Sequence, residues 1–261
     1  MEMPSLLNQR AEEILTFIES YRAEYGWARV VELAREKFVE NEAQPAQQAL
    51  GDLLLQARTL ALVQGQLDDD RHALHSGRLN HEQDISIGHH YEMLRQEACT
   101  YNHQLRGFIE SHRDSVDRYD LTRWLATASG GRHAWAESEI TGAVSEIALH
   151  AALMGLPELV DLRYGSLGED LHGYDFVATW QGRLLTVDAK TGYFHPLTEE
   201  KHGHEHLEIH VPRDVVQGFR LTRSGLDDLR RDVRGALRFK VGVEPHASHK
   251  HYAFKPIVAT A

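Results

Sequence analysis

A chain of 261 residues is long enough to bury a core, and 42% hydrophobic and 26% charged residues are typical of a globular protein. We expect neither a membrane span nor a signal peptide, and the single Cys99 excludes an internal disulfide and a cysteine-based zinc site, so a cytoplasmic setting follows. The net charge of -11 argues against a general nucleic-acid coat protein, because phosphate binding relies on Lys and Arg.

The charge is unevenly distributed along the chain. Acidic residues outnumber basic ones in residues 1–80, whereas residues 213–240 hold twice as many basic as acidic residues. A surface that binds phosphates is therefore expected in the C-terminal half, and the acidic helical half is better suited to a homodimer contact or a protein partner.

The first 80 residues show three helical patterns followed by the pattern of a short hairpin. The expected helices and strands are Gln9–Tyr25, Ala28–Phe38, Pro45–Arg58, Leu60–Gln64 and Asp70–His75, with a turn at Gly65 between the strands. Three helices and a hairpin are the parts of a winged helix, so residues 1–80 are predicted to form a domain with winged-helix character.

The helix 45–58 would be the recognition helix of such a domain. It offers only Arg58 as a cation, and the adjoining hairpin carries Asp68, Asp69 and Asp70. These acidic residues would repel phosphates, so protein contact or dimerisation is favoured over DNA reading.

Residues 81–130 are predicted to be largely helical, and Ser129-Gly130-Gly131 ends this region. Their apolar residues are irregularly spaced, which is typical of a connecting or dimerising segment. The alternative is a packed helical layer of one compact domain. A third region, residues 131–261, would hold the chemistry.

The third region opens with a helix over Ala136–Met154, where apolar residues recur at helical spacing until Gly155 and Pro157 end it. Glu139 and Glu146 lie two turns apart on one side of this helix. The residues around Glu146 are small and would let the helix approach a sheet closely. Glu146 is therefore the preferred inward-facing glutamate, and Glu139 is the alternative.

Four strands are predicted after this helix, over Leu159–Tyr164, Phe176–Trp180, Leu184–Lys190 and His206–Val211. Gln181-Gly182 is a plausible tight turn, which makes the second and third strands a hairpin. Because strand side chains alternate, Asp188 and Lys190 share one face.

Asp175 opens the first strand of the hairpin, and Asp188 lies near the end of the second. A buried carboxylate without a partner is costly, so Asp188 needs a cation. Two carboxylates from adjacent strands suit Mg²⁺ or Mn²⁺, and Lys190 suits a phosphate or an attacking water. The alternative is that Asp188 and Lys190 form an ordinary ion pair.

The segment Asp175, twelve intervening residues, then Asp188-Ala189-Lys190 resembles the PD-(D/E)xK nuclease superfamily, with Tyr174 where the family name has proline. The resemblance implies a mixed α/β fold with a restriction-endonuclease-like αβββ core in the C-terminal half. It also implies that Asp175, Asp188 and Glu146 hold the metal and that Lys190 orients or stabilises the nucleophile.

The function implied by this resemblance is a metal-dependent endonuclease that hydrolyses phosphodiester bonds in DNA, for example in restriction or phage defence. Two alternatives remain open. One is a catalytically inactive nuclease-fold subunit that binds DNA or assembles with a partner, and the other is an RNase or junction resolvase.

A helix is predicted from about Arg213, and arginines continue through it and the next helix. They would contact the phosphate backbone without reading its sequence, and the candidates are Arg213, Arg220, Arg230, Arg234 and Arg238. The last three are four residues apart and share one helix face. The alternative is a solvated face interleaved with Asp227, Asp228 and Asp232.

Alternate histidines, His202, His204 and His206, precede the last strand and offer ligands for Zn²⁺ or Ni²⁺. A glycine and flanking charges favour a solvated loop instead.

Overall fold

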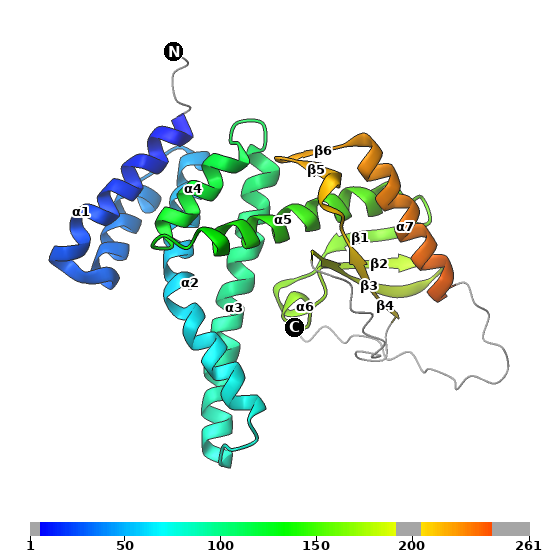
Figure 1. Cartoon of the computed structure of the whole chain (residues 1–261), viewed down its shortest axis with the longest axis horizontal. Coiled ribbons are helices and arrows are strands. Elements are labelled where there is room, and N and C mark those ends of the chain that lie inside the picture. Colours follow the sequence, from blue (N-terminus) through cyan, green and yellow to red (C-terminus); the bar gives the residue numbers. More distant parts are fainter. Residues whose placement is uncertain (1–5, 192–204, 242–261) are drawn as a thin grey trace. The chain divides into compact units, whose positions relative to one another are not determined.

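The computed structural model describes residues 6–191 and 205–241 (Figure 1). These residues belong to two compact units, Met1–Ala143 and Val144–Ala261. The first is helical, and the second combines helices with a four-stranded mixed sheet. The expected mixed α/β class with a mainly helical N-terminal half is therefore confirmed. Within the described residues, no helix is both long and apolar enough to cross a membrane.

Long helices build the N-terminal unit. They are α1 (Leu6–Arg35), the π-helical turn η1 (Glu36–Glu40), α2 (Pro45–His75), α3 (His81–His112), α4 (Arg118–Ala128) and the first part of α5 (His133–Met154). Asn80 and Asp117 begin α3 and α4, since their side chains accept hydrogen bonds from backbone amides of the first helical turn. Gly26 kinks α1, because its φ of 72° is not helical.

Residues 60–75, predicted as a short hairpin, are instead the C-terminal half of α2. Leu60, Ala61 and Leu67 are buried, and α3 packs along α2. Helix packing thus buries apolar side chains that an isolated two-stranded hairpin would leave partly in water. The hairpin prediction is wrong, and the described part of residues 1–80 has no wing to give it winged-helix character.

The chain passes from the first compact unit to the second within α5, between Ala143 and Val144. Residues 81–130 lie in the same unit as the helices before them, and α3 makes its packing contacts with α2. They are thus a helical layer of the N-terminal unit.

The sheet of the C-terminal unit has the order β1-β2-β3-β4. Its strands are β1 (Leu159–Tyr164), β2 (Phe176–Trp180), β3 (Arg183–Lys190) and β4 (Glu205–His210), and the short helix α6 (Leu167–Leu171) lies between β1 and β2. β1 and β3 are antiparallel to β2, and β4 is parallel to β3. Gln181 and Gly182, with φ of 49° and 77°, form the predicted turn. The four predicted strands are confirmed, with ends shifted by a residue at most.

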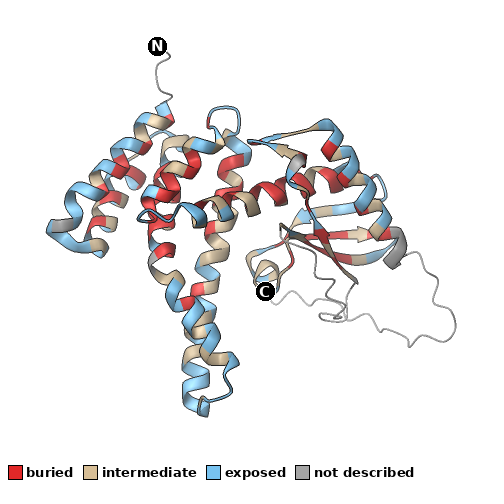
Figure 2. Ribbon diagram, in the orientation of Figure 1, coloured by how far each residue is buried: buried red, intermediate tan, exposed pale blue. Residues whose placement is uncertain are grey.

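One face of this sheet is covered by α5 and by α7 (Arg223–Val241), and buried residues concentrate there (Figure 2). α7 contributes Leu229, Val233 and Leu237, whose spacing of four makes one apolar stripe. The remaining core residues come from α5, the loops and the strands, and include Leu149, Leu153, Phe176, Trp180, Leu185, Val187, Leu207 and Ile209. Side-chain alternation therefore turns Thr186, Asp188 and Lys190 to the opposite face.

The helix predicted from Arg213 is wrong over its first ten residues. A single 3-10 turn, η2 (Arg213–Val215), is followed by a small hairpin of β5 (Val216–Gln217) and β6 (Arg220–Leu221) before α7 begins. Gly218 at a φ of 64° makes the turn, and Phe219 is buried. A left-handed glycine followed by a buried aromatic residue favours this turn over continued helix.

Candidate functional site

The candidate site lies at the end of the β2–β3 hairpin, where two carboxylates stand opposite each other. Phe176 pairs with Val187, so the preceding Asp175 aligns with Asp188 on the neighbouring strand. Asp175 Oδ2 accepts a hydrogen bond of 2.6 Å from the backbone N–H of Ala189, and the two aspartates share a side-chain hydrogen bond. The structure therefore brings together the two acids that the sequence singled out.

Burial makes this pair electrostatically unfavourable. Asp188 is only 6% exposed. Burial first, and then the negative charges of Glu146 and Asp188 and the hydrogen bond with Asp188, raise the pKa of Asp175 to about 9, against the opposing effect of the Ala189 N–H. Without a bound cation, the raised pKa keeps Asp175 protonated at neutral pH. A metal ion could replace that proton.

Lys190 is a cation beside this pair. Its Nζ contacts Asp188 Oδ2, and its side chain is 50% exposed. Burial lowers the pKa of Lys190, but the hydrogen bond and charge of Asp188, followed by the charges of Asp175 and Glu208, outweigh burial and raise it. Lys190 is therefore charged and half in water, close to the carboxylates.

The two candidate glutamates of α5 have different surroundings. The charge of Glu146 acts on Asp175, whereas the charge of Glu139 acts on Tyr101 of α3, whose pKa is raised first by burial and then by that charge. Both glutamates are half-buried. The structure thus places Glu146, and not Glu139, beside the aspartate pair.

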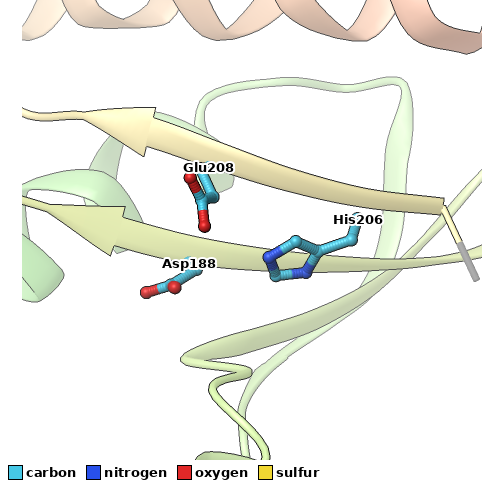
Figure 3. Close-up of side chains that lie close together, drawn as sticks. All are labelled: Asp188, His206 and Glu208. Carbon is cyan, nitrogen blue, oxygen red and sulfur yellow. The ribbon is translucent and has the colours of Figure 1, made fainter. Parts of the chain in front are cut away.

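Two further possible ligands, His206 and Glu208 of β4, lie at the site; the sequence suggested His206 only as part of a separate histidine cluster, and Glu208 not at all. Together with Asp188 they offer ligand atoms that all lie within 4.8 Å of one another, and the three side chains gather beside β3 and β4 (Figure 3). The parallel register sets Glu208 next to Asp188, and His206 Nδ1 lies 2.9 Å from Thr186 Oγ1.

A signal for these residues was present in the sequence. Leu207 and Ile209 are the apolar positions of the last strand, so alternation puts His206 and Glu208 on the other face. The pairing partner of that strand, however, could not be read from the chain, because a parallel neighbour leaves no local turn signal.

Two arginines of the basic helix α7, predicted to contact phosphates, make contacts within the protein. Arg230 Nη2 donates to the carbonyl of Ala151 at 3.4 Å, and Arg234 Nε lies 3.3 Å from Glu158 Oε1. Arg230 Nη1 is also 3.3 Å from Asp227 Oδ1. Both arginines are thus engaged with α5 and the residues after it, about one-third exposed.

The other predicted phosphate contacts are not on the same helix face. Arg213 belongs to η2 and Arg220 to β6, and both are exposed. The side chain of Arg238 lies outside the described residues, as do His202 and His204 of the histidine-rich segment.

The comparisons with known proteins leave the site to be judged on its own geometry: no protein-family model, no curated protein and no solved structure matches this chain.

Proposed function

We propose that the C-terminal unit is a metal-dependent phosphodiesterase that cleaves DNA as an endonuclease of the PD-(D/E)xK type. The observation that carries this proposal is the alignment of Asp175 and Asp188 on adjacent strands, with Glu146 acting on the same carboxylates and Lys190 beside them. A cluster of acids this close is unfavourable in a folded protein unless a cation is bound, so it is better explained by binding than by stability.

We expect the ion to be Mg²⁺ or Mn²⁺, because carboxylates are hard oxygen ligands. Asp175, Asp188 and Glu146 would hold the ion through carboxylate oxygens, which hard divalent cations prefer. Such an ion supplies charge stabilisation at a phosphate and an acidified water. His206 and Glu208 add an imidazole nitrogen and a further oxygen next to Asp188, a mixture that suits Mn²⁺ better than Mg²⁺.

Lys190 would carry the remaining chemistry of the site. Its ammonium group is held by Asp188 and is half-exposed, so it can donate to a phosphate oxygen or orient a water without leaving its strand. In the same geometry Lys190 compensates the charge of Asp188 while the metal is absent. The ion pair and the catalytic role are therefore compatible.

The order of elements also supports the nuclease proposal. α5 carries Glu146, β1 follows, the β2–β3 hairpin carries the aspartates, and β4 completes the sheet. α5 and the first three of these strands follow one another as in the αβββ core that the resemblance implies, and β4 is a fourth strand. DNA would be held through exposed arginines of the same unit, such as Arg213 and Arg220.

A catalytically inactive nuclease-fold subunit is the second candidate. The direct contact of Lys190 Nζ with Asp188 favours it, because this ion pair needs no metal. Supercoiled plasmid and RNA incubated with the purified protein and Mg²⁺, Mn²⁺ or EDTA distinguish the candidates. Plasmid nicking that EDTA abolishes supports the endonuclease, whereas metal-dependent cleavage of RNA alone indicates an RNase. Cleavage of neither polymer, with Asp188→Asn binding DNA like the parent protein, favours the inactive subunit.

A further inference from the structure

Arg58 of α2, the one cation of the predicted recognition helix, is buried and forms no ion pair with a described carboxylate. It is 6% exposed, and its Nε has no hydrogen-bond partner. Its Cζ lies 3.3 Å from the centroid of the Trp27 ring, and no carboxylate of the described residues forms an ion pair with it. A cation–π contact offsets part of the cost of burial but neutralises no charge.

Further guanidinium groups gather at the same place. The Cζ of Arg22 lies 4.6 Å from the centroid of the same Trp27 ring. Gly130 approaches Arg58 so closely that a Cβ there would lie 2.6 Å from Nη1, and Arg132 follows two residues later. Burial and the charge of Arg22 lower the pKa of Arg58, Glu19 raises it and Arg132 lowers it. The three guanidinium groups of Arg22, Arg58 and Arg132 thus have one nearby carboxylate, that of Glu19.

Two glycines allow the backbone to bring the side chains of this cluster together. Gly26, at a φ of 72°, kinks α1 immediately before Trp27, and Gly130, at a φ of 80°, follows the end of α4 where Arg58 approaches. Both backbone conformations strongly favour glycine. A purely structural arginine could be replaced by an apolar residue at lower cost, since an unpaired buried charge destabilises the fold.

We propose that Arg22, Arg58 and Arg132 bind a phosphate group that carries two negative charges, such as a phosphate monoester. The guanidinium fork matches phosphate oxygens, and the excess of two positive charges matches a dianion better than a single carboxylate. The group comes either from a small phosphate compound or from the terminal phosphate of a nucleic-acid strand. The site belongs to the N-terminal unit and does not depend on cleavage at Asp188.

The first test is a titration of the full-length protein with inorganic phosphate in EDTA at constant ionic strength, followed by calorimetry and thermal melting. We expect saturable binding and a rise in Tm that chloride does not produce. Arg132→Gln and Arg22→Gln change exposed side chains, and each is expected to weaken binding about tenfold through one lost charge-assisted contact. Arg29→Gln is the matched control, because Arg29 is exposed on α1 and paired with Glu32.

Arg58→Met tests the central residue, because methionine keeps an unbranched stem against Trp27 and removes the charge. We expect loss of phosphate binding and, without phosphate, a Tm no lower than that of the parent. Should this variant fail to fold, the two exposed variants still decide the question. No saturable binding by the parent, or equal binding by all variants and the control, would overturn the proposal.

Two short single strands of one sequence, with and without a 5′-phosphate, identify the source of the group. Displacement of inorganic phosphate by the phosphorylated strand alone indicates a strand end. Binding of inorganic phosphate that neither strand displaces indicates a small phosphate compound. Displacement by both strands equally would contradict a site for a monoester dianion.

Discussion

Asp175→Asn is expected to abolish metal binding while leaving the metal-free fold intact at neutral pH. With a pKa raised to about 9 by burial and by its acidic neighbours, the Asp175 side chain is neutral at pH 7. Asparagine is also neutral and has the same shape. Its amide oxygen can accept the Ala189 N–H that Oδ2 accepts at 2.6 Å, and its amide group can donate to Asp188. The free energy of unfolding should change by less than about 0.5 kcal/mol.

The same pKa determines how metal affinity depends on pH. With a pKa of about 9, Asp175 is mostly protonated at pH 7, so a metal must displace a proton. The apparent affinity should then rise about tenfold for each pH unit between pH 7 and 9. In the metal-free protein the folded-state pKa lies above the ordinary value of 3.8. The stability from the protonated form is therefore complete below that value and is lost as the pH rises through 9.

Calorimetry of Mn²⁺ binding in two buffers with different ionisation enthalpies measures the proton release. The parent protein should release about one proton per ion at pH 7, and Asp175→Asn should bind no ion. Thermal melting in EDTA, from pH 5 to 9, measures the stability of both proteins, and the slope with pH should be smaller in the variant. An Asp175→Asn protein that melts far below the parent at pH 7, or a metal affinity that is constant from pH 7 to 9, would refute this reasoning.

Lys190→Ala is expected to abolish plasmid cleavage and to retain Mn²⁺ binding, with a loss of about 1 kcal/mol in melting experiments because the half-exposed Lys190 is screened by water. Glu146→Gln should reduce cleavage, whereas Glu139→Gln should not, because Glu139 acts on Tyr101; equal losses would contradict the assignment of Glu146. Arg220→Ala should flatten the salt dependence of DNA binding, measured by fluorescence anisotropy, whereas the ion-paired Arg234→Ala should not. Gly182→Val should cost about 1 to 3 kcal/mol in denaturant unfolding, because valine is strained at a φ of 77°, and Gly182→Asn should cost less.

Sequence reasoning located the strands well because their signals are local. Gln181-Gly182 is a turn sequence, and the apolar positions on either side alternate, so the pairing of Asp175 with Asp188 followed from counting residues. Helical spacing put Glu139 and Glu146 on one side of the helix, and the small residues around Glu146 favoured it over Glu139. The fold class was predictable for the same reason.

The errors arose where long-range packing decided the structure. Residues 60–75 were predicted to form strands because they hold short apolar runs on either side of Gly65. They are helical in the structure, where they belong to α2 and α2 packs against α3. The sequence also does not show that Glu158 and the carbonyl of Ala151 lie beside the arginines of α7, whose role in phosphate binding stays a prediction. Glu208 was missed because its position depends on a parallel neighbour far along the chain.

The hairpin turn at Gln181 and Gly182 fixes the register of β3, so the number of residues between the turn and a side chain decides which face of the sheet that side chain occupies. Asp188 and Lys190 face away from the core because each lies an even number of residues from Gly182. Deleting one residue between the turn and Asp188 would send that carboxylate toward the apolar residues under α5 and α7 and turn Val187 to the polar face. Deleting two would preserve the faces and shift only the position along the strand. The hairpin should thus tolerate many substitutions but no single-residue deletion, which makes the length of β3 a stricter constraint than its composition.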